Sequence, residues 1–201
     1  MKPPKPHDLK KLPVTKLEAA RRQLETAITL WFHDVDPVSV HTLVMAAHGI
    51  LKPINKKRGG RPMAFDEPPP YVRPEFQTRV ARMFVEASNF FKHGASDPLA
   101  THYFAPEFNQ FMILDGCQTF QELAHEKRPL MTTFIAYSVH HNPDLFEEEA
   151  RAVLQRNELM FNTAKQWSKT EFFAEYLPTA SLVCANAATE TNSGQASSAH
   201  T

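Results

Sequence analysis

Hydrophobic residues recur three and four positions apart along most of this chain, the spacing that places them on one face of an α-helix. The first run covers residues 15–32 and begins with Thr15 and Glu18, which have the spacing of a capping box. Its apolar positions are Leu17, Ala20, Leu24, Ala27, Ile28 and Trp31. We therefore predict an amphipathic helix that begins at Thr15 and buries this stripe.

A second run follows after the short break "HDVD". Asp36 has the side chain of an N-cap, and Pro37 takes the first helical position, where a missing N–H costs nothing. Pro53 is expected to end this helix, because a proline inside a helix removes a backbone hydrogen bond. The short break between two long helices predicts an antiparallel hairpin.

Five further stretches have helical spacing, in residues 74–93, 105–123, 128–141, 144–161 and 164–177. Gly94 follows the first of them and is expected to form a left-handed cap. We find no convincing run of strand-like alternation. The pattern predicts an all-α fold, a helical bundle of about five to seven helices with an up-down antiparallel core.

Three segments lack this periodicity. Residues 1–13, "MKPPKPHDLKKLP", form a basic, proline-rich arm, and residues 185–201 form a small, polar tail; we predict that both are disordered. Residues 55–73, "NKKRGGRPMAFDEPPPYVR", are predicted to form a long surface loop. A single helical-bundle domain is therefore expected over residues 14–178.

The formal net charge is zero, but the charges are unevenly divided. Residues 1–61 contain twelve Lys and Arg against five Asp and Glu, whereas residues 62–201 contain ten against seventeen. A basic end can attract an anionic partner such as RNA or a nucleotide. Alternatively, the two halves attract each other or a neighbouring copy of the chain, as in a homodimer.

The long loop carries four basic residues that are candidates for nucleic-acid contacts: Lys56, Lys57, Arg58 and Arg61. No aromatic residue interleaves with them before Phe65, so a surface for stacking bases is not evident. A solvated loop explains the same residues without any ligand.

The cysteines, the N-terminal residues and the lengths of the apolar runs bear on the cellular compartment of the protein. Cys117 and Cys184 lie far apart, which indicates neither a disulfide framework nor a cysteine-rich zinc site. The N-terminal arm has no apolar run after it and does not read as a secretory signal. No stretch approaches the ~18 apolar residues of a membrane span. We expect a cytoplasmic protein that does not engage a membrane.

The last turns of the third predicted helix hold candidate catalytic residues: Glu86, Asn89, Lys92 and His93. A histidine titrates near neutral pH, so His93 can act as a general base at an RNA 2′-hydroxyl. Lys92 and Asn89 can then stabilise the phosphate. The simpler interpretation is the solvent face of an amphipathic helix, on which Arg82 and Glu86 form an i,i+4 pair.

Two long helices and a third that ends in Asn-x-x-x-His before a glycine-containing loop resemble the higher eukaryotes and prokaryotes nucleotide-binding (HEPN) superfamily. The resemblance covers about residues 15–140, and "ARRQLETAITLWF", "DPVSVHTLVMAAHGIL" and "NFFKH" are also similar to segments of bacterial proteins. It implies a bundle of four or five helices that commonly dimerises. Many members are metal-independent ribonucleases of toxin–antitoxin or phage-defence systems.

The chain departs from the motif of active HEPN members, in which an Arg, a polar residue and four to six further residues precede the His. Arg82 precedes His93 by eleven positions, about 16 Å of helix, which is too far for both to touch one phosphate within a subunit. Asn89 stands nearer but is not an arginine.

Two functions therefore stay open. The first is a non-catalytic, HEPN-like helical module that acts through dimerisation or a protein partner, which the missing spacing favours. The second is a metal-independent ribonuclease or nucleotide-acting enzyme with His93 as general acid or base.

The other titratable residues predict no cofactor. His41 and His48 share a face of the second helix, but neither belongs to a His-x-x-x-His or Glu-x-x-His pair, so we expect hydrogen-bonded packing and no metal. Asp115 lies in the apolar run "FMILDGC". If it is buried it needs a cation, for which Arg79 or His93 is the expected partner.

Overall fold

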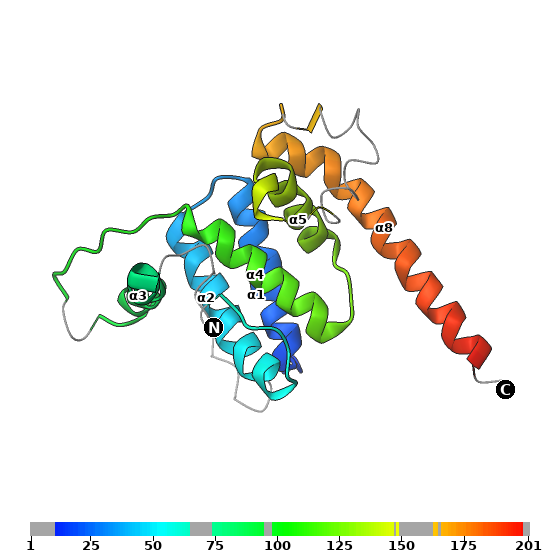
Figure 1. Ribbon diagram of the computed structural model, residues 1–201, viewed down its shortest axis with the longest axis horizontal. Coiled ribbons are helices and arrows are strands. Elements are labelled where there is room, and N and C mark those ends of the chain that lie inside the picture. The colour runs from blue at the N-terminus through cyan, green and yellow to red at the C-terminus, as the bar shows by residue number, and fades with distance from the viewer. Residues whose placement is uncertain are drawn as a thin grey trace, which may run out of the picture.

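The computed structural model describes residues 11–64, 74–94, 98–146, 148, 163–164 and 166–198. Within these residues it defines six α-helices and one short 3-10 helix, and no β-strand. Figure 1 shows their arrangement. The elements are α1 (Lys16–Phe32), α2 (Pro37–Lys57), α3 (Pro74–Lys92), α4 (Phe108–Ala124), α5 (Pro129–His141), η2 (Pro143–Leu145) and α8 (Lys169–Ser198). The predicted all-α class is confirmed for the described part of the chain.

The α1–α2 hairpin forms for the reasons that the local sequence suggests. The Thr15 hydroxyl accepts a hydrogen bond from the Glu18 backbone N–H at 3.1 Å. The Asp36 carboxylate accepts from the N–H groups of Val38 and Ser39, and this satisfies donors that the first turn of α2 leaves open. The two helices then pack against each other side by side (Figure 1).

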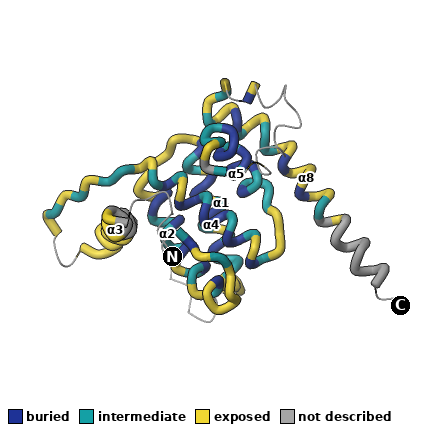
Figure 2. The backbone as a smooth tube through the Cα atoms, in the orientation of Figure 1, coloured by how far each residue is buried: buried dark blue, intermediate teal, exposed yellow. Residues whose placement is uncertain are grey.

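The hydrophobic core lies where α1, α2, α4 and α5 meet, with the start of α8 packed over it. Figure 2 shows that buried residues concentrate on these helices, whereas the described side chains of α3 are mostly exposed. Gly116 lets α4 approach α1 closely, because a Cβ at this position would lie 2.9 Å from Leu24 Cδ2. The largest fully buried side chains include those of Phe32, Phe134 and Phe172.

The predicted end of α2 at Pro53 is wrong, because the helix continues to Lys57. Contacts with other parts of the chain stabilise the last turn. The buried Asn55 donates from Nδ2 to the carbonyl of Arg61 at 2.6 Å, and Arg58 donates from Nη1 to the carbonyl of Leu123 at 2.7 Å. These bonds compensate for the backbone hydrogen bond that a proline inside a helix removes.

The predicted left-handed cap at Gly94 is also wrong. The described residues with a clearly positive φ are Asp34, Gly59 and His125. At the end of α3 the His93 N–H still bonds to the carbonyl of Asn89 at 3.0 Å. The chain therefore leaves α3 without the reversal that a left-handed residue produces.

The chain after Ala185 differs from the irregular tail that its composition suggests, since α8 continues to Ser198. Four alanines in residues 185–196 favour a helix. The C-terminal part of α8 extends away from the bundle (Figure 1). Residues 1–10 of the predicted arm, 65–73 of the loop and nearly all of the predicted helix at 144–161 lie outside the described residues.

None of the described helices combines sufficient length with sufficient apolar character to cross a bilayer.

Candidate functional site

The four residues of the predicted catalytic cluster lie together on the last two turns of α3. Glu86, Asn89, Lys92 and His93 are all exposed. Glu86 lines a small pocket of about 110 Å³, which His41 and His102 also line, and His93 lies outside this pocket. The helix alone brings these residues together, and solvent has access to all four.

The four basic residues proposed for nucleic-acid contacts divide into two pairs. Lys56 and Lys57 are exposed in the last turn of α2. Arg58 donates to the end of α4 at the carbonyl of Leu123, and Arg61 lies along the side of α4. Two of the four side chains are therefore engaged in holding the chain after α2 against α4.

Asp115 is buried and has a cation as its partner, but the partner is neither Arg79 nor His93, so that prediction is wrong. Its carboxylate binds Arg61, with Nη1 and Oδ1 3.0 Å apart, and also accepts from the N–H of Ala64. Arg61 comes close because Gly59 turns the chain at a φ of 68°. At Gly60 a Cβ would lie 1.9 Å from Asn55 Oδ1, so any other residue here would displace the Asn55 side chain from its bond to Arg61.

The two histidines of α2 connect this helix to α4, which confirms the expectation of hydrogen-bonded packing. His41 Nδ1 lies 3.0 Å from Asn109 Oδ1, and His48 Nε2 donates to the carbonyl of Met112 at 2.8 Å. Burial lowers the pKa of His48 below its ordinary value, although Asp115 and the bond to Met112 oppose this shift. The described residues contain no group of three His, Cys, Asp or Glu side chains that could hold a metal ion.

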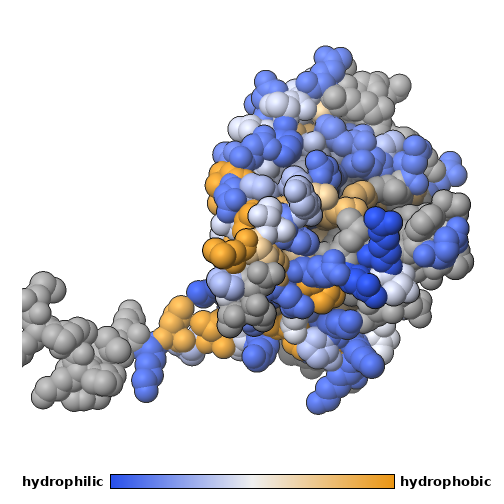
Figure 3. Space-filling model, turned by 90° about the vertical axis from the view of Figure 1, so that its left-hand side faces the viewer, coloured by the Kyte–Doolittle hydropathy of each residue, from blue (hydrophilic) through white to orange (hydrophobic). Residues whose placement is uncertain are grey.

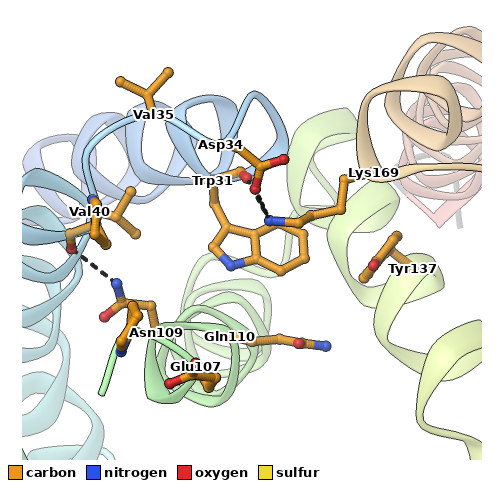
Figure 4. Close-up of a pocket in the computed structure, with 11 residues that line it drawn as sticks. Trp31, Asp34, Val35, Val40, Glu107, Asn109, Gln110, Tyr137 and Lys169 are labelled. Carbon is orange, nitrogen blue, oxygen red and sulfur yellow. Dashed lines mark hydrogen bonds and ion pairs between the residues drawn. The ribbon is translucent and has the colours of Figure 1, made fainter. Parts of the chain in front are cut away.

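A larger pocket, of about 440 Å³, lies where the end of α1 meets the starts of α2, α4 and α8 and one face of α5. Figure 4 shows how side chains from these elements converge on it. Its lining is partly apolar and partly charged: Trp31, Asp34, Val35, Pro37, Val40, Pro106, Glu107, Asn109, Gln110, Tyr137 and Lys169. We refer to it as the Trp31 pocket.

Lys169 is the central charged group of the Trp31 pocket. Its Nζ lies 4.2 Å from the centroid of the Trp31 ring, within the range of a cation–π contact. It forms an ion pair with Asp34 and also donates to the Trp31 carbonyl at 3.4 Å (Figure 4). The ammonium group is thus held by an aromatic face and two oxygen acceptors.

The aromatic wall of the pocket is fixed by ring contacts. Trp31 meets Phe134 and Tyr137 edge to face, with ring centroids 5.0 Å and 5.2 Å apart. Burial, and to a smaller extent the charge of Asp34, raise the pKa of the Tyr137 hydroxyl, which is therefore a neutral hydrogen-bonding group at neutral pH. Asp34 itself has a φ of 50°, a conformation that aspartate tolerates better than most residues.

The Trp31 pocket was not expected from the sequence. Its residues are spread over positions 31 to 169, and they fall at helix ends where no local spacing links them. The only local signal is the pair formed by Trp31 and Asp34 at the break after the first helix.

We compared the chain with models of known protein families, with curated proteins and with solved structures, and no match was found.

Proposed function

We propose that this protein is a non-catalytic, HEPN-like helical binding module that acts by pairing with a second copy of itself through the middle of α8, around Leu182 and Val183. The observation that carries this proposal is the exposure of apolar residues on this helix where it leaves the bundle. The exposed fraction is 68% for Leu182 and 48% for Val183. Figure 1 shows this part of α8 extending away from the other helices.

The charge of this part of the chain favours a second copy as the partner. In residues 179–198 the single charged residue is Glu190, so two copies can approach without strong repulsion. Most of the other residues are alanine, serine, threonine or asparagine, whose small side chains allow helices to pack closely. The opposite net charges of residues 1–61 and 62–201 add a general attraction between copies.

Other exposed apolar side chains among the described residues include those of Leu99 and Tyr103, each 94% exposed, in the segment before α4. On the face shown in Figure 3, hydrophobic side chains form small, separate patches among hydrophilic ones, which is ordinary for a protein surface. The resemblance to HEPN domains, which commonly dimerise, also supports pairing.

The size of the contact predicts a weak dimer. Burying one Leu or Val side chain contributes about 1.5–3 kcal/mol, and a symmetric pair buries each residue twice. Association itself costs on the order of 4–15 kcal/mol. The gain exceeds the cost only toward the favourable ends of both ranges, where the net reaches about −8 kcal/mol, so we expect a dissociation constant of about 1–100 μM.

The test is sedimentation velocity of the full chain over a range of concentrations around this value. The double variant Leu182→Glu, Val183→Glu should sediment as a monomer, because four new carboxylates would face one another in the dimer. Val85→Glu on α3 is the matched control, since Val85 is exposed to the same 48% as Val183. A wild-type protein that stays monomeric at 100 μM, or a dimer that both variants leave unchanged, contradicts the proposal.

A second candidate function is a metal-independent ribonuclease or nucleotide-acting enzyme, with His93 as general acid or base and Glu86, Asn89 and Lys92 beside it. The observation in its favour is the exposure of all four side chains on adjacent turns of α3, where a macromolecular substrate can reach them. Incubation of a mixed-sequence RNA without metal tests it. Cleavage by the wild type and not by His93→Ala would support the enzyme, and an RNA left intact by the wild type would contradict it.

A further inference from the structure

We infer that the Trp31 pocket binds a small organic cation of the alkylammonium class, whose charged group replaces the ammonium of Lys169 over the Trp31 ring. This inference concerns a different surface from the α8 pairing and does not depend on it. It rests on the volume of the pocket, on the cation that the protein places in it, and on the balance of donors and acceptors around that cation.

The volume suits a small molecule. Ligand pockets in proteins usually enclose about 300–1,000 Å³, and the Trp31 pocket has about 440 Å³. Apolar contact comes from Trp31, Val40, Pro106 and Tyr137, while polar side chains occupy a few positions around them. This combination of apolar walls and few polar groups is typical of ligand sites.

The protein itself shows which charge the aromatic wall accepts. The ammonium of Lys169 lies 4.2 Å from the centre of the Trp31 ring and pairs with the Asp34 carboxylate. An aromatic face is a group by which proteins recognise quaternary ammonium ligands, and a carboxylate beside it adds Coulomb attraction for a cation. Lys169 therefore marks the position that the charged group of a ligand would take.

Displacing Lys169 costs little. The Asp34 side chain is 68% exposed and that of Lys169 is 29% exposed, so solvent screens this half-exposed ion pair, and surface pairs contribute about 0–1 kcal/mol. Lys169 is also the first residue of α8, where the positive end of the helix dipole disfavours a lysine. Its side chain is long enough to move into solvent when another cation binds.

The other polar groups of the pocket favour a cation over an anion. Three formal charges line it, the carboxylates of Asp34 and Glu107 and the ammonium of Lys169, so the lining is negative by one charge. An anion could instead bind backbone N–H groups at the start of α4. Those of Phe108, Asn109 and Gln110 already donate to the carbonyls of Ala105, Pro106 and Glu107.

The amide side chains of Asn109 and Gln110 do not change the preference of the pocket for a cation over an anion. Asn109 donates to the carbonyl of Pro37, and its oxygen meets His41, so it holds α4 against α2. Gln110 can present either its oxygen or its nitrogen to a ligand. The carboxylates and the Trp31 carbonyl consequently give the pocket its preference for a positive group.

Three compounds of similar shape and different charge test the inference on the full-length protein. They are choline, the neutral 3,3-dimethylbutan-1-ol and the anionic 3,3-dimethylbutanoate. Titrations followed by the NMR signal of the Trp31 indole N–H and by calorimetry should show choline binding at least about fivefold more tightly than the alcohol, as a cation–π contact of about 1 kcal/mol predicts. The carboxylate should bind least.

The variant Lys169→Gln gives a second test with a defined sign. Removing the internal ammonium should make choline bind about threefold to tenfold more tightly, because the ligand no longer competes with Lys169. Lys127→Gln is the matched control, since Lys127 is an exposed lysine that lines a different pocket. Circular dichroism would establish that both variants are folded.

The outcomes separate clearly. Choline binding that exceeds that of the alcohol and strengthens in Lys169→Gln supports the inference. Equal binding of choline and the alcohol, tighter binding of the carboxylate, or no binding of choline by the wild type overturns it. The comparison of the three compounds on the wild type decides the question even if Lys169→Gln fails to fold.

Discussion

The end of α3 and the Trp31 pocket both gather polar side chains, but in different ways. On α3 the residues Glu86, Asn89, Lys92 and His93 lie within eight positions of one another, and a single helix brings them together. In the pocket, Trp31, Glu107, Tyr137 and Lys169 come from helices far apart in the chain. Contacts between helices orient the side chains of the pocket, whereas solvent surrounds those of α3. A local pattern can thus indicate a site without any packing that fixes its geometry.

Replacing the aromatic wall should have the largest effect on stability. Trp31→Ala removes a ring that contacts Phe134 and Tyr137, and we expect the free energy of unfolding to fall by about 2–4 kcal/mol. Urea denaturation measures the loss. The matched change on α3, Asn89→Ala, should alter stability by less than about 0.5 kcal/mol. Similar losses in the two variants would remove the contrast between a packed and an exposed cluster.

Replacing Arg61, the partner of Asp115, should reduce the free energy of unfolding by a smaller amount than replacing Trp31. Arg61→Ala leaves a buried carboxylate without its cation and should reduce the free energy of unfolding by about 1–3 kcal/mol. Arg79→Ala removes the exposed arginine on α3 that the sequence suggested as this partner, and should cost less than about 0.5 kcal/mol. Thermal and urea unfolding of the two variants measure the difference. A larger loss for Arg79→Ala would mean that the observed pairing is not the stabilising one.

Acid should destabilise the protein through His48. Because its pKa in the folded state lies below the ordinary 6.5, the unfolded chain binds a proton first as the pH falls. The contribution to stability is complete above about pH 6.5 and is lost as the pH falls through the folded pKa. His48→Gln can keep a donor to the carbonyl of Met112 but cannot titrate, so its unfolding free energy should depend less on pH between about 5 and 7. Identical pH profiles for the variant and the wild type would exclude this role.

The smallest effect is expected at His93. His93→Ala removes an exposed side chain at the end of α3 and should change the free energy of unfolding by less than about 0.5 kcal/mol. The variant therefore separates chemistry from folding in an RNA cleavage assay. A loss of more than about 1 kcal/mol would show that His93 has a structural role. The α3 cluster would then be held by packing, as the Trp31 pocket is.

Several features of the fold follow from neighbouring residues alone. Thr15 and Asp36 cap α1 and α2 as their sequence contexts predict. The end of α2 could not be predicted in this way, because the helix continues past Pro53 and bonds to Arg61 and Leu123 hold its last turn. Those bonds join residues that are distant in the chain or that depend on the turn at Gly59.

The sequence by itself determined the helical class, the starts of the first helices and the polar stripe at the end of α3, because each depends on residues within one or two helical turns. The tertiary structure alone decided that Asp115 pairs with Arg61 and that Lys169 lies over Trp31. The physical reason is the range of the interactions. Capping and periodicity act along a few residues of one helix, whereas burial and ion pairing depend on which distant helices the hydrophobic core brings into contact.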